Sequence, residues 1–184
     1  MINQIKTDFD KIVKTSSFST DDIKLKRQYL NKFIENGFPN RKLENWKFSD
    51  ISQIIQRNIG ELSFYNDYSS SNKIDTSIFI DGLEHNKIFF INGRVEKIDF
   101  SYEDKNKVEI NEESKLDNKL NNNNSLIDLN TAFTNKSYKI LVKENYLFNK
   151  PLIVYHISNN KIKSKNINLR LEFELKQNSS LRLI

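Results

Sequence analysis

Few side chains in this sequence can bind a metal through sulfur or imidazole nitrogen, or transfer a proton near neutral pH. The 184 residues include no cysteine, which excludes disulfides and thiolate metal sites within the chain. The two histidines, His85 and His156, lie far apart in the sequence. His85 follows Glu84 in a predicted turn and is expected at the surface. His156 shares a predicted strand face with Leu152 and Val154, which is typical of an imidazole that a hydrogen bond satisfies rather than of a metal ligand.

Sequence motifs for catalysis or cofactor binding are equally scarce. The chain contains no glycine-rich phosphate loop, no HExxH pattern and no GxSxG pattern. No pair of carboxylates has a spacing that defines a site. We therefore predict no catalytic, cofactor-binding or metal-binding residue in this chain, and we do not expect an enzyme.

The densest group of residues with chemical potential lies between Gly37 and Asp50. Arg41 and Glu44 are close enough in sequence to form an ion pair. Trp46, the only tryptophan, offers a large apolar anchor together with the neighbouring Phe48. Such a group is either a recognition site or a structural joint, and buried aromatic rings with local ion pairs are mostly structural. Because no partner residues elsewhere complete a site, we interpret the stretch as a joint between two helices.

Helices are predicted on both sides of this joint. Ser19 or Thr20 is a suitable N-cap for the helix before it, and Gly37 and Pro39 end that helix. Asp50 is a suitable N-cap for the helix after it. Apolar residues at helical spacing predict the buried faces of an N-terminal helix (Ile2, Ile5, Phe9, Ile12, Val13), a second (Ile23, Leu30, Phe33, Ile34) and a third (Ile51, Ile54, Ile55, Ile59).

After the third helix the pattern changes to strands. Residues 61–76 are predicted to form a loop, and residues 111–124 a mobile surface segment. Asn92 and Gly93 predict a tight hairpin turn, because both tolerate positive φ. Strands are expected at 78–80, 87–91, 94–98, 138–142, 152–157, 169–175 and 181–184, and a helix at 125–133. From the alternation alone, an antiparallel meander is the first expectation.

Four short motifs resemble one known family. Residues 39–50, P-N-R-K-L-E-N-W-K-F-S-D, resemble the P-x-R-x-x-E-x-W-K-Y-T-D signature near the start of SufD proteins, with mild departures at Phe48 and Ser49. These proteins belong to the SufB/SufD family and are scaffold subunits of the Suf iron–sulfur cluster assembly system. Three further matches follow in the family's order: F-F-I-N-G-R at 89–94, L-N-T-A-F at 129–133 and K-P-L at 150–152.

The resemblance implies an α+β fold. Residues 1–134 would form the N-terminal α/β domain of the family, and residues 135–184 the first rungs of a right-handed parallel β-helix, or solenoid. The strand pattern continues to Ile184 without a polar cap, which a terminal rung normally needs. We therefore expect an N-terminal portion of a longer scaffold protein, truncated within the solenoid.

The resemblance also implies a function and partners. The parent protein would be a non-catalytic scaffold that pairs with a SufB-like paralogue and acts with a SufC-like ATPase. An iron–sulfur cluster is implied for the full assembly complex, with no cofactor bound by this portion. The family's cluster-related residues lie in later rungs, so none is transferred to a position here.

Charge and hydropathy restrict the other classes of partner. The net charge of +5 arises from 29 basic and 24 acidic residues, which is a mixed surface rather than a basic stripe. No signal peptide is visible, and the longest strongly apolar run, 152–157, is far too short to span a bilayer. We expect a cytoplasmic protein without nucleic-acid or membrane partners. A stand-alone solenoid module that binds proteins, unrelated to cluster assembly, and a weak nucleic-acid binder remain the alternatives.

Overall fold

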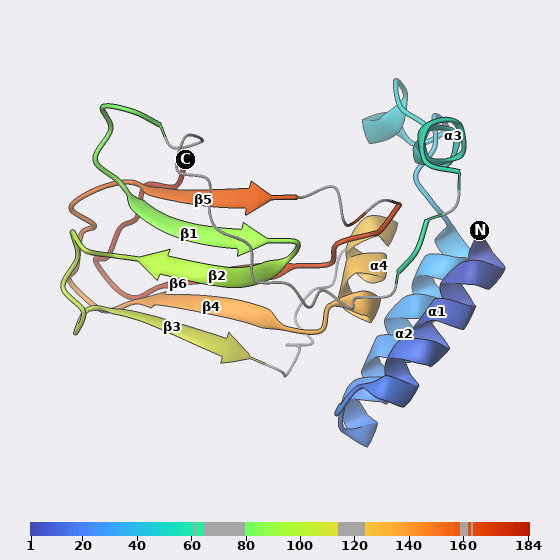
Figure 1. Cartoon of the computed structure of the whole chain (residues 1–184), viewed down its shortest axis with the longest axis horizontal. Helices are drawn as coiled ribbons and strands as arrows, with labels where there is room; N and C mark the ends of the chain where they lie inside the picture. The colour runs from blue at the N-terminus through green and yellow to red at the C-terminus, as the bar shows by residue number, and fades with distance from the viewer. Residues whose placement is uncertain (61, 65–79, 114–123, 159–161, 163) are drawn as a thin grey trace. The chain divides into compact units, whose positions relative to one another are not determined.

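The computed structural model describes all residues except 61, 65–79, 114–123, 159–161 and 163 (Figure 1). The described residues form two compact units. The first comprises those within Met1–Asp67, Ser114–Asn135 and Lys163–Arg170, and the second those within Tyr68–Glu113, Lys136–Ile162 and Leu171–Ile184. The expected domains, 1–134 and 135–184, stay a prediction.

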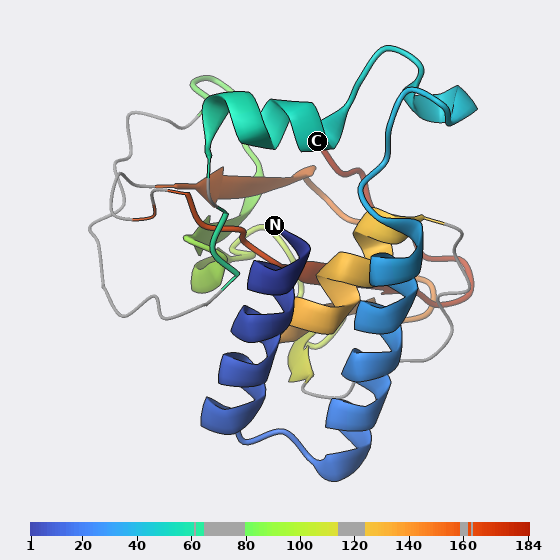
Figure 2. The same cartoon turned by 90° about the vertical axis from the view of Figure 1, so that its right-hand side faces the viewer.

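The first unit contains the described helices. They are α1 (Ile2–Thr15), α2 (Thr20–Asn36), the short 3-10 helix η1 (Glu44–Trp46), α3 (Ile51–Asn58) and α4 (Ser125–Phe133). Helix α4 packs against α2, and Figure 2 shows it beside the pair formed by α1 and α2. The predicted apolar stripes of α1 and α2 meet in one core, whose buried members are Ile5, Phe9, Ile12, Tyr29, Leu30, Phe33, Phe38, Ile55, Phe64, Leu129, Ala132 and Phe133.

The predicted helix ends are confirmed. The Ser19 hydroxyl accepts a hydrogen bond from the main-chain N–H of Asp22 at 3.2 Å, so Ser19 rather than Thr20 is the N-cap of α2. The Asp50 carboxylate accepts one from the N–H of Gln53 at 3.0 Å and caps α3. Gly37 ends α2 with a φ of 68°, a conformation that favours glycine.

The second unit is built from two three-stranded sheets (Figure 1). The strands are β1 (Asn86–Ile91), β2 (Arg94–Asp99), β3 (Val108–Glu113), β4 (Ser137–Val142), β5 (Leu152–Ile157) and β6 (Arg170–Leu175), in the orders β2-β1-β5 and β3-β4-β6. Strand β1 is antiparallel to β2 and parallel to β5, and β3 is antiparallel to β4. The predicted hairpin turn is confirmed, with φ values of 50° at Asn92 and 81° at Gly93.

The expected start of a parallel β-helix is wrong. In a solenoid each strand pairs in parallel with its neighbours in the adjacent rungs, whereas each of these two sheets contains an antiparallel pair. The two-residue turn forces β2 back along β1. Cross-strand ion pairs between β3 and residues in or next to β4, Glu109 with Lys143 and Glu112 with Lys136, support the second antiparallel pair. The simple antiparallel meander is also wrong, because β1 and β5 are parallel.

Several predicted segments differ in detail. The mobile segment expected at 111–124 begins in β3, whose last residues are Asn111–Glu113, and residues 114–123 lie outside the described residues. Most of the loop expected at 61–76 and of the strand expected at 78–80 also lies outside them. In β6 both faces are half-buried up to Leu175, which is exposed, so the predicted contrast between a buried and a wet face is weak. None of the helices in the described ranges is long and apolar enough to cross a membrane.

Candidate functional site

The stretch from Pro39 to Asp50 forms a chain of tight turns between α2 and α3. The N–H of Leu43 donates to the carbonyl oxygen of Asn40 at 3.1 Å, and the N–H of Trp46 donates to that of Leu43 at 2.8 Å. The N–H of Ser49 then donates to the carbonyl oxygen of Trp46 at 2.8 Å. The main chain is thus held mostly by its own local hydrogen bonds, which leaves the side chains free to face solvent.

Two predictions for this stretch are wrong: the ion pair between Arg41 and Glu44, and the apolar anchor formed by Trp46 and Phe48. Arg41 and Glu44 are both exposed, and no ion pair joins them. Trp46 is only half-buried, and Phe48 is 85% exposed. The physical reason is competition for the core, because Phe38 packs edge-on against Phe33 with ring centroids 5.0 Å apart and takes the buried place.

A pocket lies beside these turns. Its volume is about 310 Å³, and it is lined by Asn36, Pro39, Leu43, Glu44, Asn45, Trp46, Asn124 and Ser125. The lining combines the apolar faces of Trp46, Leu43 and Pro39 with amide groups and one carboxylate. Next to it, the Lys47 ammonium lies 5.1 Å from the centroid of the Phe48 ring. Leu43, Trp46, Lys47, Phe48 and this pocket are called the joint surface below.

His85 is buried, and its expected place at the surface is wrong. Its side chain is among the largest fully buried ones, at 2% exposure. Its Nδ1 lies 2.6 Å from the carbonyl oxygen of Leu83, which can only accept, so Nδ1 carries the proton. Nε2 then accepts from the Tyr155 hydroxyl at 2.7 Å. The ring therefore holds the segment before β1 in contact with Tyr155 of β5.

His156 is exposed, and the expected hydrogen-bonded core imidazole is wrong as well. Its ring stacks on Phe90 with centroids 5.1 Å apart and an interplanar angle of 9°. Partial desolvation lowers the pKa of His156 below its usual value. The described residues contain no group of three His, Cys, Asp or Glu able to hold a metal ion.

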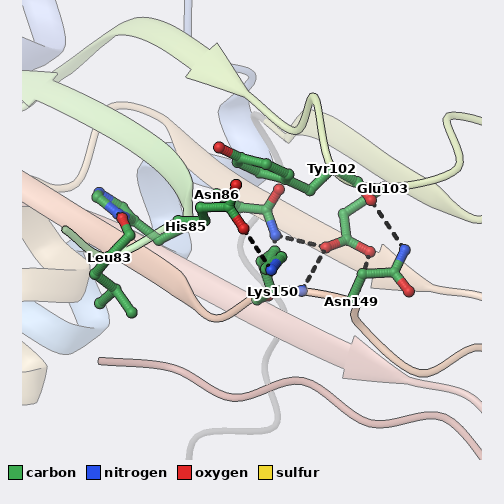
Figure 3. Close-up of polar contacts among 8 residues, drawn as sticks. Leu83, His85, Asn86, Tyr102, Glu103, Asn149 and Lys150 are labelled. Carbon is green, nitrogen blue, oxygen red and sulfur yellow. Dashed lines mark hydrogen bonds and ion pairs between the residues drawn. The ribbon is translucent and has the colours of Figure 1, made fainter.

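Glu103 is a buried hydrogen-bond hub that the sequence did not reveal (Figure 3). One carboxylate oxygen accepts from Asn86 Nδ2 at 2.6 Å and from the N–H of Lys150 at 3.2 Å. The other accepts from the Tyr146 hydroxyl at 2.7 Å and from the N–H of Asn149 at 3.1 Å. All four donors are electrically neutral, and three of them belong to residues of the segment before β5. The carboxylate therefore holds this segment in place through hydrogen bonds. Nothing local marks Glu103, because its partners lie far away in the sequence.

Lys26 is a second buried ionisable group that the sequence analysis missed. It occupies a core-facing position of α2 between Ile23 and Leu30, and burial lowers its pKa from 10.5 to about 8 against the opposing attraction of Asp22. Its ammonium lies 4.5 Å from the centroid of the Phe18 ring. Its position in the sequence could have predicted this burial. Lys26 lies three residues after Ile23 and four before Leu30, and this spacing places it on the apolar face of the helix.

The comparisons with known proteins do not assign a family. No protein-family model and no curated protein matches the chain.

The joint surface differs from the buried groups Glu103 and Lys26 because its aromatic and aliphatic side chains are open to solvent. Exposed apolar groups of this size beside cations suit the binding of another macromolecule.

Proposed function

We propose that this chain is part of a SufD-like scaffold subunit in iron–sulfur cluster assembly, acting with a SufB-like paralogue and a SufC-like ATPase. One observation carries the proposal, which is the match of residues 39–50 to the family signature. Six of its eight specified residues are identical: Pro39, Arg41, Glu44, Trp46, Lys47 and Asp50. A scaffold acts by binding its partners, and no catalytic residue is assigned to this chain.

The geometry of this stretch supports the proposal. Asp50 has a clear structural task as the cap of α3. Arg41, Glu44 and Lys47 are exposed and take part in no ion pair with the described residues. Core packing therefore does not explain why these three residues match the signature. A role in binding a partner would explain the match.

The three shorter matches fall on defined elements. The match at 89–94 spans the end of β1 and its turn, that at 129–133 is the second half of α4, and that at 150–152 leads into β5. At the last of these, the Lys150 carbonyl oxygen accepts from Asn86 Nδ2 at 3.0 Å, which ties the motif to the start of β1. The shared order of the four motifs supports the proposed family relationship, which therefore rests on the sequence matches and not on the solenoid expected for the family.

Co-expression tests the proposal. The complete reading frame that encodes this chain is expressed with an affinity tag beside the SufB-like and SufC-like proteins of the same genome. We expect all three to co-purify and to elute together in size-exclusion chromatography. Depletion of the tagged protein in its native cell should lower the activity of iron–sulfur enzymes and leave enzymes without clusters unchanged. Separate elution of the tagged protein, with unchanged iron–sulfur enzymes on depletion, would overturn the proposal.

One alternative rests on a specific observation. The exposure of Phe48 also suits a stand-alone protein-binding module that has no part in cluster assembly. Such a module would bind its partner in cells that lack the SufB-like and SufC-like proteins, and its depletion would leave iron–sulfur enzymes active.

A further inference from the structure

The joint surface exposes more apolar area than local stability requires. Phe48 is 85% exposed and Leu43 is 52% exposed, while the half-buried ring of Trp46 lies between them in sequence. The local main-chain hydrogen bonds and the Asp50 cap already hold the turns in place. Covering solvated aromatic side chains with a partner lowers the free energy of the complex, and such residues dominate the binding energy of many protein interfaces.

The charges around these apolar groups are mainly positive. Arg41, Lys42 and Lys47 flank them, against the single carboxylate of Glu44 within residues 41–48. All four side chains are exposed, and none forms an ion pair with the described residues. Cations beside an apolar patch favour an acidic partner, because complementary charge speeds association and rejects basic competitors.

The pocket indicates the kind of contact that the partner makes. At about 310 Å³ it lies at the lower end of the size of small-molecule sites and accepts a large side chain. Pro39, Leu43 and Trp46 offer apolar contact, and the Asn45 amide offers a donor and an acceptor for a main-chain peptide group.

We propose that the joint surface docks an acidic segment of a partner protein, with an apolar side chain of that segment in the pocket beside Trp46. A single-stranded nucleic acid is the less favoured occupant. Stacking on Phe48 and Trp46 would suit its bases, but three cations are few for phosphate binding, and the Glu44 carboxylate at the pocket repels phosphate. The docking site stands on its own geometry and does not depend on the function proposed above.

Selection from a random peptide library tests the proposal. The library is displayed on phage and selected on the 184-residue chain, with counter-selection on the double variant Lys47→Glu, Phe48→Ser. Both changes lie on exposed side chains, so the variant should fold, and circular dichroism checks this. We expect the enriched peptides to carry several Asp or Glu residues around an aromatic or branched apolar residue.

The emission of Trp46 then measures binding at the site itself, because the chain has no other tryptophan. A synthetic copy of an enriched peptide, free of tryptophan, should shift this emission, and its affinity should fall with added salt. Lys47→Glu and Phe48→Ser should each weaken binding by about tenfold or more. The control Leu147→Ser, which alters an exposed leucine in the other compact unit, should bind like the wild type.

Three results would overturn the proposal. The first is a selection that enriches no peptide over the double variant, and the second is one that enriches basic or uncharged sequences. The third is binding of oligo-uridylate, but not of the enriched peptides, with a shift in Trp46 emission that Phe48→Ser abolishes. That last result would assign the surface to single-stranded nucleic acid.

Discussion

The ammonium group of Lys26 donates a hydrogen bond to the carbonyl oxygen of Thr134, the residue that ends α4, although the two lie 108 residues apart in the sequence. The bond joins the middle of α2 to the C-terminal end of α4, where a positive charge is favourable to the helix dipole. Burial disfavours this charge. The pKa of Lys26 is lowered because the cost of desolvation exceeds the attraction of Asp22.

The buried lysine predicts a stability that rises in alkaline solution. Between pH 8 and pH 10.5 the unfolded chain holds the Lys26 proton more tightly than the folded chain, so the free energy of unfolding increases with pH. The shift from 10.5 to about 8 corresponds to about 3 kcal/mol. Urea unfolding at several pH values should show this gain in wild type relative to Lys26→Met. The exposed Lys24→Met on the same helix should behave like the wild type, and equal pH profiles for wild type and Lys26→Met would contradict the prediction.

We predict that truncation of the Glu103 side chain lowers the stability of the protein substantially. Glu103→Ala leaves the buried Asn86 amide without one of its two acceptors and the part-buried N–H groups of Asn149 and Lys150 without an acceptor, and we expect a cost of about 3 kcal/mol. The matched control is Glu109→Ala, which removes an ion pair with Lys143 at the surface and should cost less than about 1 kcal/mol. Urea unfolding measures both, and hydrogen exchange should show lost protection at Asn149 and Lys150 in Glu103→Ala alone. Equal costs would rule out the hub.

The aromatic residues near the joint should differ in their contribution to stability. Phe33→Ala empties a place in the core and should cost about 3 to 5 kcal/mol. Trp46→Ala should cost less than half of that, since its ring is half-buried, and Phe48→Ala should cost less than about 0.5 kcal/mol. Chemical denaturation of the three variants orders them. If Trp46→Ala were as costly as Phe33→Ala, the stretch would be a packed joint after all.

The contact of His85 with Tyr155 predicts an energetic coupling. Tyr155→Phe leaves the buried Nε2 of His85 without a donor and should cost about 1 to 2 kcal/mol. A double-mutant cycle with His85→Phe should return a coupling of about 1 kcal/mol. Tyr138→Phe is the control, because the Tyr138 hydroxyl makes no hydrogen bond to the described residues, and it should be nearly neutral. Additive costs for the two changes would show that the hydrogen bond contributes nothing.

Much of the local structure could be predicted from the sequence. The N-caps Ser19 and Asp50, the end of α2 at Gly37 and the turn at Asn92 and Gly93 all formed as expected. Each depends on groups within about four residues of one another, so neighbours in the sequence decide it. The buried stripes of α1 and α2 were predictable for the same reason, since helical spacing alone determines which residues share a face.

The tertiary structure alone decided which strands pair and which aromatic residues are buried. The parallel pairing of β1 with β5 joins residues 66 positions apart, such as Asn86 and Leu152, and alternation along a strand does not identify its partner. Phe38 and Phe48 are equivalent in type, and only the space beside Phe33 decided that Phe38 enters the core while Phe48 stays in solvent. The burial of His85 and Glu103 follows likewise from partners distant in the chain. Sequence thus determined the local elements, because local contacts form them, and competition for a shared core determined the exposed surface.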